Sequence, residues 1–350
     1  MQISAPTNFD FRIINKLKGK ITCTYGSLNN DPGESILQAY AIPKISFGQL
    51  KEYVEHSHSF GVEFNYIMNY PEIKLDKIKT SFLEKLNKIN VDIITAADQN
   101  FISFIKKEYS FKICSSVICK INSLERAIMY KELGCDILCL DPSRNNDLEF
   151  IKLIKKETNL MISLIANNIC LPGCPYKEEH FVRGGNLEKA SIKCLRLKLK
   201  DPALIKTTGF IHPGDVKKYE EAGVDFLKIG GRTKPSWWII DCVSAYSSGS
   251  YKKNSYRLMN TFASENKLPE IIKKLIILLP AAFIKSIFLI LYFFSGKKVF
   301  MLLVKEKNLK SFLRLYLAGD LFFGGDKEIL SNEKIRDYLI KEIDKFIADA

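Results

Sequence analysis

Residues 121–143 read INSLERAIMYKELGCDILCLDPS, and they contain a helix pattern followed by a strand pattern. Asn122 and Ser123 are typical helix N-caps, apolar residues then recur three and four positions apart, and Gly134 is a typical helix stop. The apolar run after Gly134 ends at polar residues. We interpret the stretch as a helix that leads into a buried strand.

The same plan recurs along the chain. Residues 212–232, HPGDVKKYEEAGVDFLKIGGR, again place a capped helix pattern before a glycine, Gly223, and an apolar run. The stretches EHSHSFGVEFNYIMN and KINVDIITAAD share this order, so the sequence contains an internal repeat of a βα unit. Runs predicted as strands cover residues 20–27, 62–69, 91–98, 111–116, 135–143, 161–167, 208–213 and 224–231.

Near-continuous hydrophobic strands that alternate with helices are typical of parallel strands buried on both faces. Closing such strands into a ring leaves no edge strand, so we predict an α/β fold, a (β/α)8 TIM-barrel-like domain, over residues 1–250. A doubly wound open sheet is the alternative. In a barrel the polar residues at the strand ends carry function. These are Tyr25, Asn65, Asn69, Asp98, Ser115, Ser116, Asp141, Ser143, Asn167, Asn168, His212 and Arg232.

Residues 251–350 have a different pattern, and we expect a helical C-terminal extension. Its segment 268–304 is intensely apolar but contains Pro280 and Lys285. A lysine at the centre of a transmembrane helix costs about 2.5 to 3.5 kcal/mol, which disfavours a simple span. The segment is predicted to lie on a membrane surface or, equally, to pack as a lid or a homo- or heterodimer contact. Residues 331–350 are predicted to form an amphipathic packing helix.

Charge and cysteine content limit the partners and the compartment. The 350-residue chain has 52 Lys and Arg against 39 Asp and Glu, a formal charge of +13, which favours an anionic substrate, RNA or an anionic membrane surface. The lysines are scattered and no RNA-recognition signature is present, so nonspecific attraction is the default for RNA. The first residues lack an apolar leader. We therefore expect a reducing, cytoplasmic setting for the 9 cysteines.

Residues 163–183, SLIANNICLPGCPYKEEHFVR, place Cys170, Cys174 and His180 just after a predicted strand, and Cys194 follows. In a reducing compartment, clustered cysteines indicate a metal or cluster site rather than disulfides. The C-x3-C spacing is not the usual zinc spacing, so zinc is the weaker prediction. Three soft ligands and a fourth suit an iron–sulfur cluster. The alternative is a tight Pro/Gly turn that holds thiols.

The motifs NNICLPGCPYKEEHF, KCLRLKLKDP and IHPGDVKKYEEAGVDFLKIGGR together resemble the peptidase U32 family, the so-called collagenase-like proteases. The resemblance covers about residues 20–250. It implies a barrel-like α/β domain and, from several members, a 4Fe-4S cluster held by four cysteines. Cys170, Cys174 and Cys194 match that pattern by position.

Two departures from the family pattern affect this comparison. The fourth cluster ligand is not obvious, and Cys23, Cys114 and His180 are the candidates. The family's acidic position in its KIEGR-like motif is Gly231 here, while Arg232 is retained.

The resemblance also guides the prediction of function. Some members are associated with proteolysis, and others resemble oxygen-independent hydroxylation factors that modify RNA or a quinone ring. The sequence shows no H-E-x-x-H zinc-protease motif. We predict an iron–sulfur enzyme acting on an anionic substrate, with Arg232 and His212 at the mouth of the barrel.

In this prediction, Arg232 binds a carboxylate or phosphate, or instead forms a structural salt bridge. His212 serves in acid–base chemistry or caps the helix after it. The alternatives for the whole protein are a metal-dependent peptidase and a non-catalytic, membrane-peripheral maturation partner.

Overall fold

The computed structural model describes residues 1–29, 32, 43–176, 187–252, 255–260 and 333–349. The chain forms two compact units. The first contains Met1–Pro172 and Thr208–Lys252, and the second contains α7 (Leu187–Lys200) and α15 (Glu333–Asp349). The predicted division into residues 1–250 and 251–350 stays a prediction, and each unit is described by itself.

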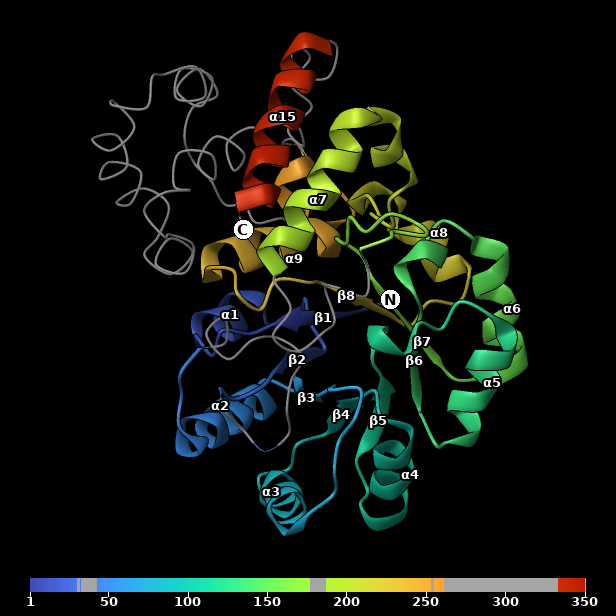
Figure 1. Cartoon of the computed structure of the whole chain (residues 1–350). Helices are drawn as coiled ribbons and strands as arrows, with labels where there is room; N and C mark the ends of the chain where they lie inside the picture. The colour runs from blue at the N-terminus through green and yellow to red at the C-terminus, as the bar shows by residue number, and fades with distance from the viewer. Residues whose placement is uncertain (30–31, 33–42, 177–186, 253–254, 261–332, 350) are drawn as a thin grey trace. The chain divides into compact units, whose positions relative to one another are not determined.

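The first unit is a closed barrel of eight parallel strands in the order β1 to β8, which confirms the predicted (β/α)8 fold (Figure 1). The ring closes between β1 and β8, where Ser4 pairs with Lys228. The open doubly wound sheet is therefore excluded. The strands are β1 (Gln2–Pro6), β2 (Cys23–Gly26), β3 (Glu63–Met68), β4 (Ile93–Ala96), β5 (Lys112–Ser115), β6 (Ile137–Cys139), β7 (Met161–Ile165) and β8 (Phe226–Lys228).

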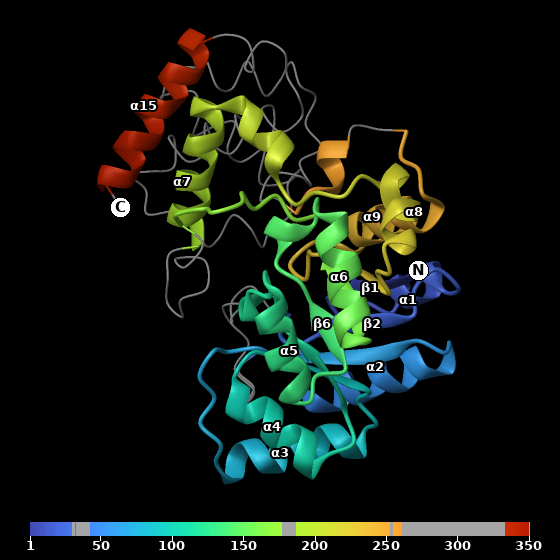
Figure 2. The same ribbon diagram turned by 90° about the vertical axis from the view of Figure 1, so that its right-hand side faces the viewer.

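Helices enclose the ring of strands, as Figures 1 and 2 show for α2 to α6. Most begin where the sequence provides a cap: the side chains of Ser46, Asp76, Asp98, Ser123 and Asp147 each accept a hydrogen bond from a backbone N–H of the first turn. The helices of this unit are α1 (Arg12–Leu17), α2 (Phe47–Ser59), α3 (Lys77–Lys88), α4 (Gln99–Glu108), α5 (Leu124–Glu132), α6 (Leu148–Thr158), α8 (Val216–Glu221) and α9 (Ser236–Ser248).

The strand prediction was wrong at two places. Residues 208–213 form no strand; Ile211 donates its backbone N–H to Ala166 just beyond β7, and the short helix after it begins at Pro213. The missed strand is Gln2–Pro6, which closes the ring. Its five residues, QISAP, interrupt the apolar Ile3 with the polar Gln2 and Ser4, so it lacks the apolar run that marks the other strands.

The internal repeat has a structural explanation. In each of three repeats the aspartate just before a strand accepts a hydrogen bond from a backbone N–H of a neighbouring strand. Each also pairs with a basic side chain from a preceding helix at 2.7 to 2.8 Å. Each aspartate thus joins two strands and a helix at the amino-terminal end of the barrel. The pairs are Asp92 with His58, Asp136 with Lys106, and Asp225 with Lys155.

The second unit pairs α7 with α15, which lie side by side in both views (Figures 1 and 2). Leu339 and Ile343 of α15 are buried, and Arg196 of α7 forms a two-armed ion pair with Asp344 at 2.6 and 3.1 Å. The amphipathic helix predicted near the C-terminus is confirmed. The apolar segment 268–304 lies outside the described residues. Across the part of the chain that is described, no helix is long and apolar enough to cross a membrane.

Candidate active site

The interior of the barrel has an apolar layer below its carboxyl-terminal end. Six buried side chains from five strands form one cluster there, with Val117, Met161 and Ile165 packed against it. Because side chains two residues apart on a strand point to the same face, residues two positions further on also face the interior. We call the cluster the apolar layer; it consists of Cys23, Ile93, Cys114, Ile137, Cys139 and Phe226.

Four polar residues lie above the apolar layer, and we call Tyr25, Asn65, Thr95 and Lys228 the polar layer. Tyr25, Thr95 and Lys228 each come two residues after a member of the apolar layer, and Asn65 pairs in register with Tyr25 and Ile93. The Thr95 hydroxyl donates to Asn65 Oδ1 at 2.8 Å. The carboxyl ends of the strands are where barrel enzymes place their chemistry.

Lys228 stands out in the polar layer. Its Nζ lies 4.2 Å from the centre of the Tyr25 ring, a cation–π contact. The Tyr25 hydroxyl donates to the Ile229 carbonyl at 2.6 Å, so the ring is held in place. The charge of Lys228 lowers the pKa of Cys23, Cys114 and Cys139, against the stronger raising effect of their burial. The contact with Tyr25, on the strand face that Lys228 shares with Phe226, indicates that the ammonium group faces the interior of the barrel.

The predicted site residue Arg232 also lies at this end, four positions after Lys228. Its Nη1 donates to Ser27 Oγ at 3.1 Å. Burial raises the pKa of the Tyr25 hydroxyl, and the charge of Arg232 acts in the opposite direction. Arg232 is half-buried. Its predicted role in binding a carboxylate or phosphate stays a prediction.

Gly231 explains one departure from the family pattern. Its φ is +133°, which favours glycine, and an added Cβ would lie 2.6 Å from Trp238 Cζ3. The ring of Trp238, which is buried in α9, thus occupies the space that a side chain at position 231 would need. A glutamate at this position would require both the backbone and Trp238 to move.

His212 has a capping contact. Its Nδ1 accepts the backbone N–H of Gly214 at 3.1 Å and caps the short 3-10 helix Pro213–Asp215. Of the two roles expected for His212, the cap is therefore the one with a visible contact. Its acid–base role stays a prediction.

Several polar residues predicted at the strand ends hold the loops together. Asn167 binds Gly230 through both its amide nitrogen and its oxygen, at 3.0 and 2.7 Å. Asp98 caps α4, and Asp141 caps the short helix after β6. These groups build the rim of the barrel.

The second unit brings two of the predicted cysteine ligands together. Cys174 donates a hydrogen bond to the sulfur of Cys194, and this bond, supported by the charge of Lys198, lowers the pKa of Cys194 to about 6 although burial raises it. Lys198 is one turn further along α7 and is fully buried. Two thiols that are distant in the sequence thus share one site. The sulfur of Cys194 is accordingly disposed to be a thiolate.

The other candidate ligands are in different surroundings. The backbone N–H of Cys170, in the first unit, donates to Asn168 Oδ1 at 2.6 Å. Cys23 and Cys114 belong to the apolar layer, where burial raises the pKa of both thiols, for Cys23 to about 12. His180 lies outside the described residues. Within the described ranges, no three His, Cys, Asp or Glu side chains are arranged to hold a metal ion.

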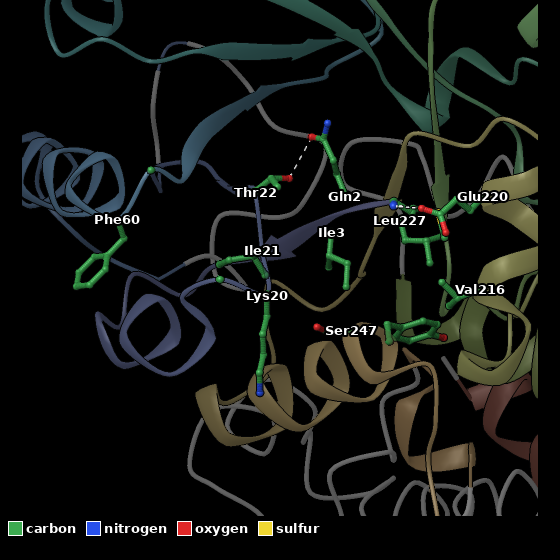
Figure 3. Close-up of a pocket in the computed structure, with 14 residues that line it drawn as sticks. Gln2, Ile3, Lys20, Ile21, Thr22, Phe60, Val216, Glu220, Leu227 and Ser247 are labelled. Carbon is green, nitrogen blue, oxygen red and sulfur yellow. Dashed lines mark hydrogen bonds and ion pairs between the residues drawn. The ribbon is translucent and has the colours of Figure 1, made fainter.

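Two pockets of the barrel unit differ in position. One, of about 490 Å³, lies at the amino-terminal end, where Gln2 contacts Thr22 and the Met1 amine contacts Glu220 (Figure 3). The other, of about 360 Å³, lies beside the carboxyl ends of β4 and β5 and is lined by Asp98, Cys119 and Tyr130, among others. Only the second lies at the end that carries the polar layer.

Sequence reasoning overlooked Lys228. The available signal was a single lysine in the apolar run VDFLKIGG, two residues after Phe226 and therefore on the same strand face. A lone charge on the inward face of a buried strand is unusual, because lysine is almost never fully buried without a partner.

Comparison with known proteins finds a family model that matches part of the chain. The family model described as peptidase family U32 matches residues 40–171. This segment is similar to peptidase family U32. Cys170 lies inside the U32 match, whereas Cys174, Cys194 and Lys228 lie beyond its end.

Individual relatives are distant. An uncharacterized protease of Methanocaldococcus jannaschii, MJ1657, is 26% identical over 233 residues, which cover 62% of this chain and 70% of that protein. The solved U32 peptidase Mk0906 aligns with a TM-score of 0.41 at 12% identity, over 48% of this chain and 69% of its own. A 3-hexulose-6-phosphate synthase from Salmonella typhimurium aligns with a TM-score of 0.42 at 12% identity, over 71% of this chain and 98% of its own. These structural scores carry no statement about activity.

Proposed function

We propose that this protein is a U32-family iron–sulfur enzyme that modifies an anionic substrate without oxygen. The observation that carries the proposal is the contact between Cys174 and Cys194 in the second unit. A cluster requires thiolates held close together, and this pair supplies one thiolate with a second thiol beside it.

The donor set fits a 4Fe-4S cluster better than zinc. Cys170, Cys174 and Cys194 are soft ligands, which suit iron–sulfur chemistry. The bound cluster would supply one-electron redox chemistry, while Lys198 would balance the negative charge of the thiolates.

The fourth ligand is best sought outside the apolar layer. Burial keeps the thiols of Cys23 and Cys114 protonated, and a protonated thiol is a poor ligand. This argument favours His180, or a ligand that is not part of this chain, over either buried cysteine.

The test is anaerobic purification of the full chain, followed by an absorption spectrum and quantitation of iron and sulfide. We expect a brown protein whose broad visible absorption and iron are lost in Cys174→Ala and Cys194→Ala. Cys135→Ala is the matched control, because Cys135 is a buried cysteine of the barrel unit, and it should keep its iron. A colourless, iron-free wild-type protein would overturn the proposal.

A metal-dependent peptidase is the second candidate. It is supported by the family's name and by the word protease in the name of the archaeal relative. It predicts a colourless protein that cleaves gelatin or casein and loses this activity on treatment with a chelator. An anaerobic brown protein without proteolysis would exclude this candidate.

A further inference from the structure

The polar layer contains two donors for which the described residues supply no matching acceptor. No described residue forms an ion pair or a hydrogen bond with Lys228 Nζ, which instead makes a cation–π contact with the Tyr25 ring. Asn65 is 4% exposed, and its Oδ1 is taken by Thr95. Its Nδ2 has no hydrogen-bond acceptor in the described part of the chain. A cation and a neutral donor therefore face the same interior.

Other cations around the strands are paired. Lys112 meets Glu63 at 2.6 Å, Lys106 meets Asp136 at 2.8 Å, and Lys155 meets Asp225 at 2.7 Å. Removing an ammonium group from water is costly unless an opposite charge compensates it. Glu63, two residues before Asn65 on β3, is already bound to Lys112. Among the described residues, Lys228 therefore has no carboxylate to complement its charge.

We propose that the polar layer binds the oxyanion group of a ligand, a carboxylate or a phosphate, between Lys228 Nζ and Asn65 Nδ2. Tyr25 positions Lys228 from below; it does not donate to the anion, because its hydroxyl is bonded to Ile229. The apolar layer beneath prevents the ligand from entering deeper into the barrel. The inference rests on the proposed function in one respect, since it gives the anionic substrate proposed there a binding place at this end of the barrel.

The test measures binding of two probes, inorganic phosphate and acetate, by titration calorimetry at constant ionic strength with the full chain. We expect the wild-type protein to bind at least one of them. Lys228→Met should weaken binding by about tenfold or more, because a hydrogen bond to a charged group is worth about that factor. Lys228→Arg should retain most of the binding. The stronger probe identifies the class of oxyanion.

The matched control is Lys112→Met, which removes a lysine from the opposite end of the barrel and should leave binding unchanged. If Lys228→Met does not fold, Asn65→Ala is used to test the proposal instead, and it should weaken anion binding by about two- to tenfold. Failure of the wild type to bind either probe would overturn the proposal. Unchanged binding by Lys228→Met, or by Asn65→Ala where that variant decides, would do the same.

Binding is measured on iron-loaded and on iron-free protein. Retained anion binding by a protein that never takes up iron would refute the proposed function and leave this inference intact. An iron-loaded protein that does not bind the anions would refute this inference and leave the proposed function intact.

Discussion

The two ends of the barrel differ in how their charged side chains are paired. At the amino-terminal end, Asp92, Asp136 and Asp225 each bind a strand N–H and a basic side chain. At the carboxyl-terminal end, Lys228 lies over an aromatic ring and no described residue pairs with it. Satisfied charges join elements and stabilise the fold. An unsatisfied one is a cost that a binding site can recover when its ligand arrives.

This comparison predicts that substitutions at the two ends will affect different properties. Changes at the amino-terminal end should reduce stability and leave ligand binding intact in the folded fraction. Changes in the polar layer should have the opposite effect. The four predictions below run from the largest expected effect to the smallest.

Among the substitutions of charged residues, Asp225→Ala should cause the largest loss of stability, about 2 to 4 kcal/mol in the free energy of unfolding. It leaves the Ile162 N–H without its acceptor and the half-buried Lys155 without its carboxylate. Urea denaturation followed by circular dichroism measures the change. Asp215→Ala is the control: among the described residues the Asp215 side chain pairs with Lys218 in an exposed position, so this variant should lose less than about 1 kcal/mol. Equal losses in the two variants would refute the structural role assigned to the repeat.

Asp10→Asn should cost about 1 kcal/mol at pH 7. Hydrogen bonds from Arg12 lower the pKa of Asp10 to about 2, with a further contribution from Ser236, but Arg12 is exposed and solvent screens the pair. Because the folded pKa lies below the unfolded value, this stabilisation is present above about pH 4 and is lost as the pH falls toward 2. Urea unfolding of both proteins at pH 7, 5 and 3 checks this. A difference that grows as the pH falls would contradict it.

Asp344→Asn should cost only about 0.2 to 1 kcal/mol, although its pair with Arg196 has two arms. The Asp344 side chain is 49% exposed, so water competes for both partners. Thermal unfolding of the full chain measures the effect. Leu339→Ala, which truncates a buried side chain of the same helix, should cost more, about 2 to 5 kcal/mol. The reverse order would show that charge, and not burial, holds α15 on α7.

Lys228→Met should leave the free energy of unfolding within about 1 kcal/mol of the wild type, or raise it, because it removes a partly desolvated cation without breaking an ion pair. Urea denaturation in a buffer without multivalent anions measures it. Lys155→Met, at the other end, should be clearly destabilising, because it leaves Asp225 unpaired. A large loss in Lys228→Met would mean that Lys228 is a structural residue and would remove the contrast between the two ends.

Much of the fold was predictable because its signals are local. The glycines at 134 and 223 end helices with φ of +101° and +92°, and Ser123 caps α5, as the sequence indicated. β1 was missed because a short strand becomes recognisable only from its partners on both sides. Residues 208–213 were predicted as a strand because they contain an apolar run, and Ile211 is indeed buried. Their backbone, however, bonds to Ala166 beyond the end of β7 and is not part of the sheet.

The candidate site was less predictable than the fold. Arg232 was expected near the strand ends, and Cys174 and Cys194 were expected to share a site; both remain predictions of function, and Lys228 was overlooked. Its importance depends on what surrounds it, and those residues come from β2, β3 and β4. The spacing of residues along one segment does not show whether a carboxylate lies near a given lysine in space.

The sequence by itself determined the βα units, their caps and their order, because these depend on residues a few positions apart. The tertiary structure decided which charges are paired, since that depends on the closure and register of the strands. In the sequence, the three repeat aspartates cannot be distinguished from acidic residues on the surface, yet each joins two strands and a helix. Lys228 looks like any strand lysine, and only closure of the ring places it over Tyr25 above the apolar layer.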